Sequence, residues 1–69
     1  MNLGGAIGTI AGQIYTAFVD KGDVELSEVK KEIGKDKILV DMAIGWLTRE
    51  GKAEVTKDGR SSIKVKILK

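Results

Sequence analysis

The stretch Asp36–Glu50, DKILVDMAIGWLTRE, decides the fold, because its apolar residues recur at the spacing of one helical face. The residues that share this face are Leu39, Val40, Met42, Ala43, Trp46 and Leu47. Asp36 is placed to cap the first turn, and Gly51 can end the last turn in a left-handed conformation. The residues from Lys52 to Val55 then alternate like a strand, so we expect the helix to lead directly into a sheet.

An earlier helix is predicted over residues 6–19, again from apolar periodicity. Its buried face would consist of Ile7, Ile10, Ala11, Ile14 and Phe18. Gly4, Gly8 and Gly12 form a stripe beside that face, which Tyr15 and Val19 continue. Two interpretations of this stripe remain open: close packing or fraying within the domain, which we favour, or a homodimer contact.

The segment between these two helices predicts a turn, an edge strand and a short helix. Residues 20–23 have turn composition, and residues 24–26 form the edge strand. Ser27 is placed to cap a helix over residues 28–33. The break at residues 34–35 then joins two helices by a very short connection, which is typical of a helix-turn-helix.

The last part of the chain predicts a β-hairpin of residues 52–56 and 61–68. We expect a three-residue loop, with Lys57 and Asp58 in a type I turn and Gly59 left-handed. In that register Ala53 lies opposite Ile63, and Lys64 and Lys66 point outward. The order of elements indicates an α+β winged helix, with residues 1–69 as a single domain. The predicted core residues are Ile10, Ile14, Phe18, Leu39, Ala43, Leu47 and Val65.

Composition argues against several classes of function. The chain has 69 residues with no Cys and no His, so thiolate and imidazole sites are excluded. No pair of acids converges in a predictable cleft, so we expect neither an enzyme nor a metal or other cofactor. The apolar start lacks a basic region and is broken by Gly, and nothing reaches the length of a membrane span. We therefore expect a soluble, cytoplasmic protein.

Two segments, IGTIAGQIY at residues 7–15 and AIGWLTREGK at residues 43–52, resemble a family of small prokaryotic winged helix-turn-helix proteins without an established function. The similarity spans nearly the whole chain, and the second motif is the more specific. The resemblance implies the fold and a link to DNA. It implies no catalytic residue, cofactor or known partner.

Nucleic-acid binding is the sharpest hypothesis for function. The net charge is only +2, yet residues 52–69 carry six basic residues against two acidic ones. The candidate contacts with double-stranded DNA are Lys35, Lys37, Thr48, Arg49, Lys57, Arg60, Lys64 and Lys66. Asp41 and Gly45 lie on the groove-facing side of the predicted helix, which suits phosphate contact better than base reading.

Two alternatives to DNA binding stay open. The lysines of the hairpin are also what a solvated sheet face carries to prevent edge-to-edge aggregation. The second alternative is a protein interaction or homodimerisation module without DNA binding. Its contact would be formed by Gly4, Gly8, Gly12, Tyr15 and Val19, with Ile44 and Leu68 as further apolar residues left over after folding.

Overall fold

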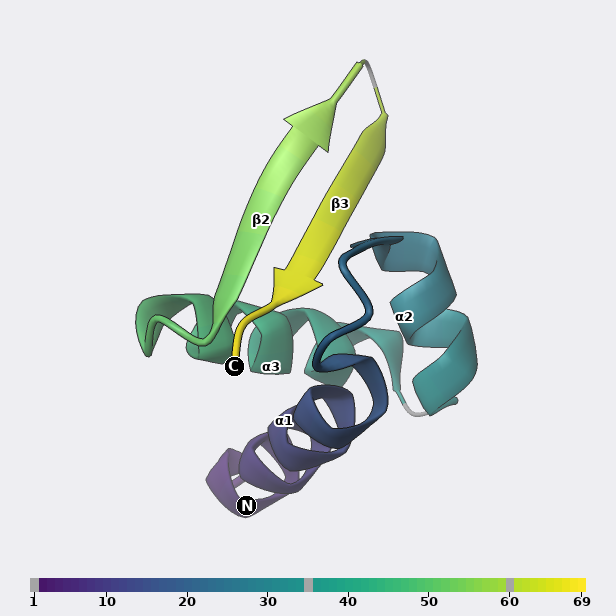
Figure 1. The fold of residues 1–69 in the computed structure, drawn as a ribbon. Coiled ribbons are helices and arrows are strands. Elements are labelled where there is room, and N and C mark those ends of the chain that lie inside the picture. Colours follow the sequence, from purple (N-terminus) through teal and green to yellow (C-terminus); the bar gives the residue numbers. More distant parts are fainter. Residues whose placement is uncertain (1, 35, 60) are drawn as a thin grey trace.

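The structure, a computed structural model, describes residues 2–34, 36–59 and 61–69, without the side chain of Asp58. The described residues form three helices and a three-stranded antiparallel sheet in the order β1-β3-β2 (Figure 1). The elements are α1 (Gly4–Phe18), β1 (Asp23–Glu25), α2 (Leu26–Ile33), α3 (Lys37–Arg49), β2 (Ala53–Asp58) and β3 (Ser62–Ile67). This order confirms the α+β winged-helix prediction, with β2 and β3 as the wing.

Helix α3 has the two ends that the sequence predicts. The Asp36 carboxylate accepts a hydrogen bond of 2.9 Å from the Ile38 amide, which satisfies one free donor of the first turn. At the other end Gly51 is left-handed, with φ of 77°. The Gly51 amide donates to the Thr48 carbonyl and the Lys52 amide to the Leu47 carbonyl, which together make a Schellman motif. The motif turns the chain from α3 into β2.

The prediction that Ser27 caps α2 is wrong. The helix already begins at Leu26, and Glu25 holds the preceding extended position without a side-chain cap. Leu26 packs against the core as part of the helix, while Ser27 lies exposed in the first turn. Partial burial of Leu26 and the pairing of Glu25 with Lys64 in β3 thus fix where strand β1 changes into α2.

One hydrophobic core lies where α1, α2, α3 and the base of the sheet meet. The buried residues are Ile10, Ala11, Ile14, Phe18, Val29, Val40, Ala43, Ile44, Leu47, Ala53, Val65 and Ile67. All the predicted core residues belong to this list except Leu39, which is partly buried at its edge. Helix α1 begins at Gly4 rather than at residue 6, and the Asn2 side chain accepts a hydrogen bond from the Gly4 amide at this end.

The buried face of α3 is rotated from the predicted one. Ile44, expected to be left over, is only 5% exposed, whereas Trp46 is 47% and Met42 49% exposed. Trp46 borders the same hollow as Gly8 and Gly12 of α1. Glycine has no side chain that could cover the indole ring, so this edge of α3 stays open to solvent.

The wing has a loop of the predicted length, but the prediction that Lys57 and Asp58 form a type I turn is wrong, because both residues belong to β2. The register differs as well. Ala53 pairs with Ile67, Val55 with Val65 and Asp58 with Ser62, so β2 runs on through Asp58. The prediction that Ala53 faces Ile63 is therefore wrong by four residues, although Gly59 is left-handed as predicted. The longer hairpin projects away from the helices (Figure 1). As a consequence Val55, on the inward face, stays 43% exposed.

Candidate nucleic-acid interface

The predicted DNA contacts lie on several surfaces. Lys37, Thr48 and Arg49 are exposed on α3, and the wing carries the predicted lysines in β2 and β3. Lys35 and Arg60 lie outside the described residues. Lys57 pairs with Ile63, one position along from the pair of Thr56 and Lys64. Because successive pairs project to opposite faces of a sheet, Lys57 and Lys64 lie on different sides of the wing.

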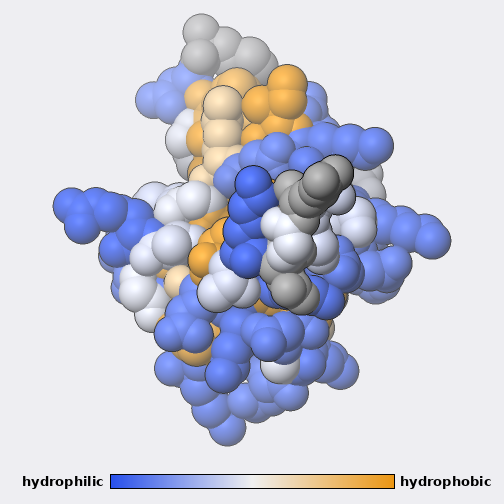
Figure 2. All heavy atoms as spheres, turned by 90° about the horizontal axis from the view of Figure 1, so that it is seen from above, coloured by the Kyte–Doolittle hydropathy of each residue, from blue (hydrophilic) through white to orange (hydrophobic). Residues whose placement is uncertain are grey.

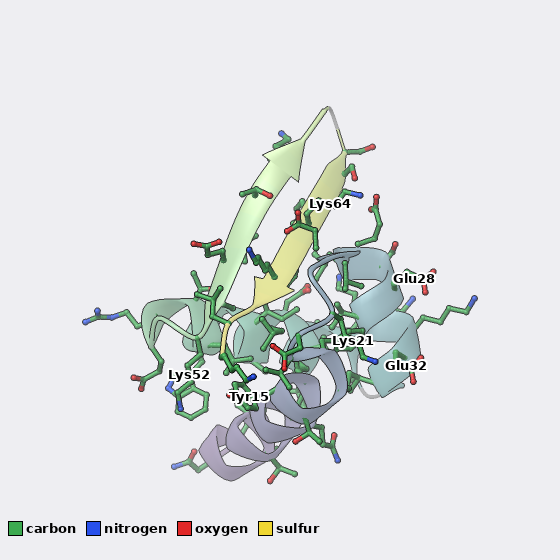
Figure 3. All side chains as sticks on the ribbon, viewed as in Figure 1. Tyr15, Lys21, Glu28, Glu32, Lys52 and Lys64 are labelled. Carbon is green, nitrogen blue, oxygen red and sulfur yellow. The ribbon has the colours of Figure 1, made fainter. Side chains whose placement is uncertain are left out.

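The outer face of the sheet balances its own charges. Lys64 Nζ lies 3.0 Å from Glu25 Oε1, and the Ser62 hydroxyl donates to the same carboxylate at 2.9 and 3.1 Å. The Lys64 ammonium, followed by the Ser62 hydroxyl, holds the pKa of Glu25 below its usual range. Figure 3 shows Lys64 on β3, on the side where β1 joins the sheet. Its charge is thus already paired.

Lys66 has a similar setting in the ladder. It pairs with Asp23 of β1 on one side and with Glu54 of β2 on the other. Opposite charges directly across neighbouring strands attract one another. Lys64 and Lys66 therefore both lie beside acidic residues of this chain, which compete with a phosphate for their charges.

The outward side of α3 lacks groups that read bases. Ile38 is 65% exposed and Met42 49%, and Gly45 presents no side chain. Asp41 forms an ion pair with Lys30 of α2, with 3.0 Å between Oδ1 and Nζ. The Thr48 hydroxyl donates to the Ile44 carbonyl at 2.8 Å. Base edges are read most often by Arg, Lys, Asn and Gln, and among the residues of the first three turns of α3 only Lys37 is one of these.

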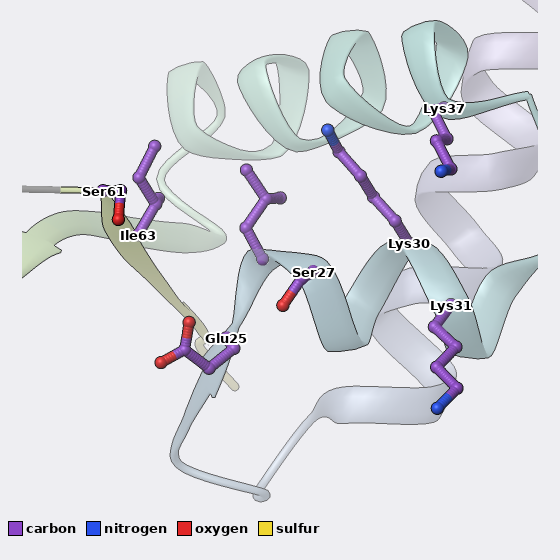
Figure 4. A pocket seen from close by; sticks show the side chains of 8 residues that line it. Glu25, Ser27, Lys30, Lys31, Lys37, Ser61 and Ile63 are labelled. Carbon is purple, nitrogen blue, oxygen red and sulfur yellow. The ribbon is translucent and has the colours of Figure 1, made fainter.

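A basic groove does form between α2, the start of α3 and the wing. Its volume is about 540 Å³, and the residues around it are Glu25, Leu26, Ser27, Lys30, Lys31, Lys37, Ser61 and Ile63. Lys30 reaches from α2 toward α3, and Lys37 extends from α3 toward α2 (Figure 4). Lys31 is exposed, and no ion pair engages Lys31 or Lys37 within the described residues.

Lys30 and Lys31 were not among the residues expected from the sequence. The sequence feature that could have identified them is their position a few residues before Lys35 and Lys37, on the other side of the short break in the helix-turn-helix. Such a break brings the side chains of two helices together, so lysines before and after it can share a groove. The groove is the best-defined gathering of lysines that the described residues offer.

Comparison with known proteins agrees with this architecture. A family model described as a winged helix-turn-helix domain (DUF2582) matches residues 1–65. The chain belongs to this winged helix-turn-helix family. An uncharacterized protein of Methanocaldococcus jannaschii is 42% identical over 59 residues, which cover 81% of this chain and 83% of that protein. No solved structure matches the chain.

The opposite side of this winged helix-turn-helix domain carries the residues of the predicted homodimer contact. Gly8 is partly buried and Gly4 and Gly12 are exposed, while Tyr15 and Val19 pack partly against the core. A Cβ added at Gly8 or Gly12 would meet no atom within 4 Å, so packing within the chain does not require these glycines. Seen from above, apolar surface gathers on one side of the molecule and polar surface covers much of the rest (Figure 2).

Among the described residues, no helix combines the length and the apolar character that crossing a bilayer demands. The contacts with DNA and with a second copy stay predictions.

Proposed function

We propose that this domain binds duplex DNA through the phosphate backbone, with little selectivity for base sequence. The observation that carries the proposal is the basic groove, where Lys31 of α2 and Lys37 of α3 flank one hollow without an ion-pair partner among the described residues. Lys30 also borders this groove, and the hydroxyls of Ser27 and Ser61 supply further donors. Ammonium and hydroxyl groups are the usual partners of backbone phosphates.

The outward side of α3 supports contact with the phosphate backbone rather than with bases. Its outward side presents the apolar Ile38 and Met42 and the bare backbone of Gly45. Direct readout needs donors and acceptors that match base edges, and these residues have none in their side chains. Membership of a winged helix-turn-helix family supports DNA as the partner, while the surface of α3 limits the mode of binding.

The test is a titration of duplexes of several sequences with the protein over a range of salt concentrations. We expect similar affinities for all duplexes and a linear fall of log affinity with log salt. Lys31→Ala and Lys37→Ala should each flatten this slope by about 0.9, the value for one lost phosphate contact. Lys66→Ala is the matched control, because Asp23 and Glu54 already flank Lys66. An equal effect of Lys66→Ala would contradict the proposal that DNA binds in the basic groove. A strong preference for one duplex would contradict binding through the phosphate backbone alone.

Self-association is the second candidate function, and the exposed apolar side chains of α3 favour it. Met42 and Trp46 border a hollow of about 420 Å³ with Gly4, Ile7 and Gly8 of α1, and none of the charged residues that the structure describes borders it. Apolar patches of this kind commonly mark protein contacts. Sedimentation at increasing protein concentration tests this candidate: a dimer that Met42→Lys dissociates supports it, and a monomer at high concentration removes it.

A further inference from the structure

A second hollow, here called the aromatic hollow, lies between α1 and the end of α3. It has a volume of about 540 Å³ and shares no residue with the basic groove. The residues that matter for its chemistry are Gly8, Gly12, Tyr15, Trp46, Lys52 and Lys69. Tyr15 and Lys52, labelled in Figure 3, both border this hollow. Two of the three aromatic residues of the chain thus border one hollow together with two lysines.

The floor and walls of the aromatic hollow suit a planar group. Trp46 is 47% exposed, so much of the indole ring is available for stacking. Gly8 and Gly12 leave the floor open, because nothing lies within 4 Å of a Cβ built at either position. Any larger side chain there would begin to fill the space. A flat ring can therefore approach the backbone of α1 while it contacts Trp46.

The charge of the aromatic hollow selects an anion. Lys52 is exposed, and no acidic side chain in the described part of the chain borders the hollow. Lys69 pairs with Asp20 at 3.4 Å, but their side chains are 80% and 63% exposed, so water and salt screen this pair. A second copy placed over the hollow about a two-fold axis would bring its own Lys52 and Lys69 to the same seam. Like charges would then oppose self-association here, whereas a phosphate would be attracted.

We propose that the aromatic hollow binds a nucleotide, with the base stacked on Trp46 and the phosphate held by Lys52. A nucleotide combines the two features that the hollow matches, a planar base and an adjacent negative charge. The ligand is either a free nucleotide or an unpaired nucleotide within a strand, since both present this chemistry. The site is separate from the groove proposed for duplex DNA and does not depend on it.

Trp46 is the single tryptophan of the chain and so reports directly on this site. Its fluorescence is followed during titration with thymidine monophosphate, with thymidine, with inorganic phosphate and with a short single strand of thymidylates. We expect saturable quenching by the monophosphate, with weaker binding of thymidine and of phosphate alone. Equal affinity for the monophosphate and the strand identifies a free nucleotide as the ligand, and much tighter binding of the strand identifies an unpaired one.

Two pairs of variants localise the binding. Gly12→Leu fills the hollow, whereas Gly5→Leu makes the same change elsewhere on α1, at an exposed position that also has open space. Leu favours helix over Gly, so both variants should keep α1 folded. We expect Gly12→Leu to weaken binding at least about tenfold, as loss of base stacking does. Lys52→Ala should weaken binding of the monophosphate but not of thymidine, and Lys21→Ala serves as its exposed control.

Three outcomes would overturn the proposal. The first is the absence of saturable quenching up to about 5 mM monophosphate, a range that reveals even millimolar affinity. The second is equal weakening by Gly5→Leu and Gly12→Leu, or by Lys21→Ala and Lys52→Ala. The third is a change of Trp46 fluorescence with protein concentration that nucleotides do not affect, which would show that a second copy covers the hollow.

Discussion

Glu25 is the residue that ties the wing to the helices. Its carboxylate accepts hydrogen bonds from Lys64 and Ser62, residues that lie near the far end of the chain. Both contacts favour the charged form, so the pKa of Glu25 lies below its ordinary value of 4.5. The folded state therefore binds a proton at Glu25 less readily than the unfolded chain does. The stabilisation from this group is present above the unfolded pKa and is lost as the pH falls through the folded pKa.

We predict that Glu25→Gln lowers the melting temperature at neutral pH but not in acid. The substituted amide keeps the shape of the side chain and loses the charge that Lys64 binds. Thermal melts of both proteins between about pH 7 and about pH 3 measure the effect, and the two curves should converge as Glu25 becomes protonated. A difference in melting temperature that stayed constant across this pH range would show that Glu25 stabilises the fold through packing rather than through its charge.

Sequence patterns do not reveal contacts between residues that are far apart in the chain. This explains which residues of the candidate site could be predicted and which could not. The exposed positions Lys37 and Arg49 follow from the helical period of α3. The pairing of Lys64 with Glu25 does not, because it joins residues 39 positions apart, brought together only when β1 adds to β3. The same holds for Lys30, which meets Asp41 only after α2 packs on α3.

At the scale of elements, the two short helices of the helix-turn-helix begin in different ways. Asp36 caps α3 through a hydrogen bond between neighbours in the chain, so local sequence predicts it. Ser27 looks equally suitable, but burial of Leu26 starts α2 earlier. We predict that Asp36→Ala costs about 1 kcal/mol of stability, within the usual range for a lost cap. Ser27→Ala should be nearly neutral, and denaturant melts of both variants measure the difference.

The rotated face of α3 gives the next prediction. Leu47→Ala should cost about 2–5 kcal/mol, because Leu47 is 3% exposed and its loss would leave a cavity in the core. Met42→Ala on the same helix should cost less than about 1 kcal/mol, because half of Met42 remains in solvent. Chemical denaturation decides between the two faces: similar losses for both variants would place Met42 in a contact that the monomer does not show.

The wing shows why an element can be predicted while its pairing is not. A shift of four residues between β2 and β3 leaves the same residues facing inward, because side chains alternate with a period of two. Ala53 and Val65 face the core in the predicted register and in the observed one. The apolar pattern therefore could not separate the two registers. In the observed register β2 extends through Asp58, which pairs with Ser62.

At the scale of the whole molecule, folding cancels the uneven distribution of charge along the chain. Residues 1–26 carry three acids against one base, and residues 52–69 carry six bases against two acids. Strand β1 brings Asp23 and Glu25 from the acidic part beside Lys66 and Lys64 of the basic part. Among the described lysines that form no ion pair, Lys31 and Lys37 lie together at the basic groove, where we propose that DNA binds.

Asp41 controls how many of these lysines a phosphate can engage. It holds Lys30 in an ion pair of 3.0 Å at the edge of the groove, with 24% of the Lys30 side chain and 50% of the Asp41 side chain exposed. Asp41→Asn removes one negative charge from the side proposed to face DNA and releases Lys30 at the same time. We predict tighter binding to every duplex and a slope of log affinity against log salt that is steeper by about 0.9, the effect of one added phosphate contact. The double variant Asp41→Asn with Lys30→Ala is the control and should restore the original slope. Tighter binding without a steeper slope would mean that Asp41 acts by repulsion alone, and unchanged binding would place the DNA away from this groove.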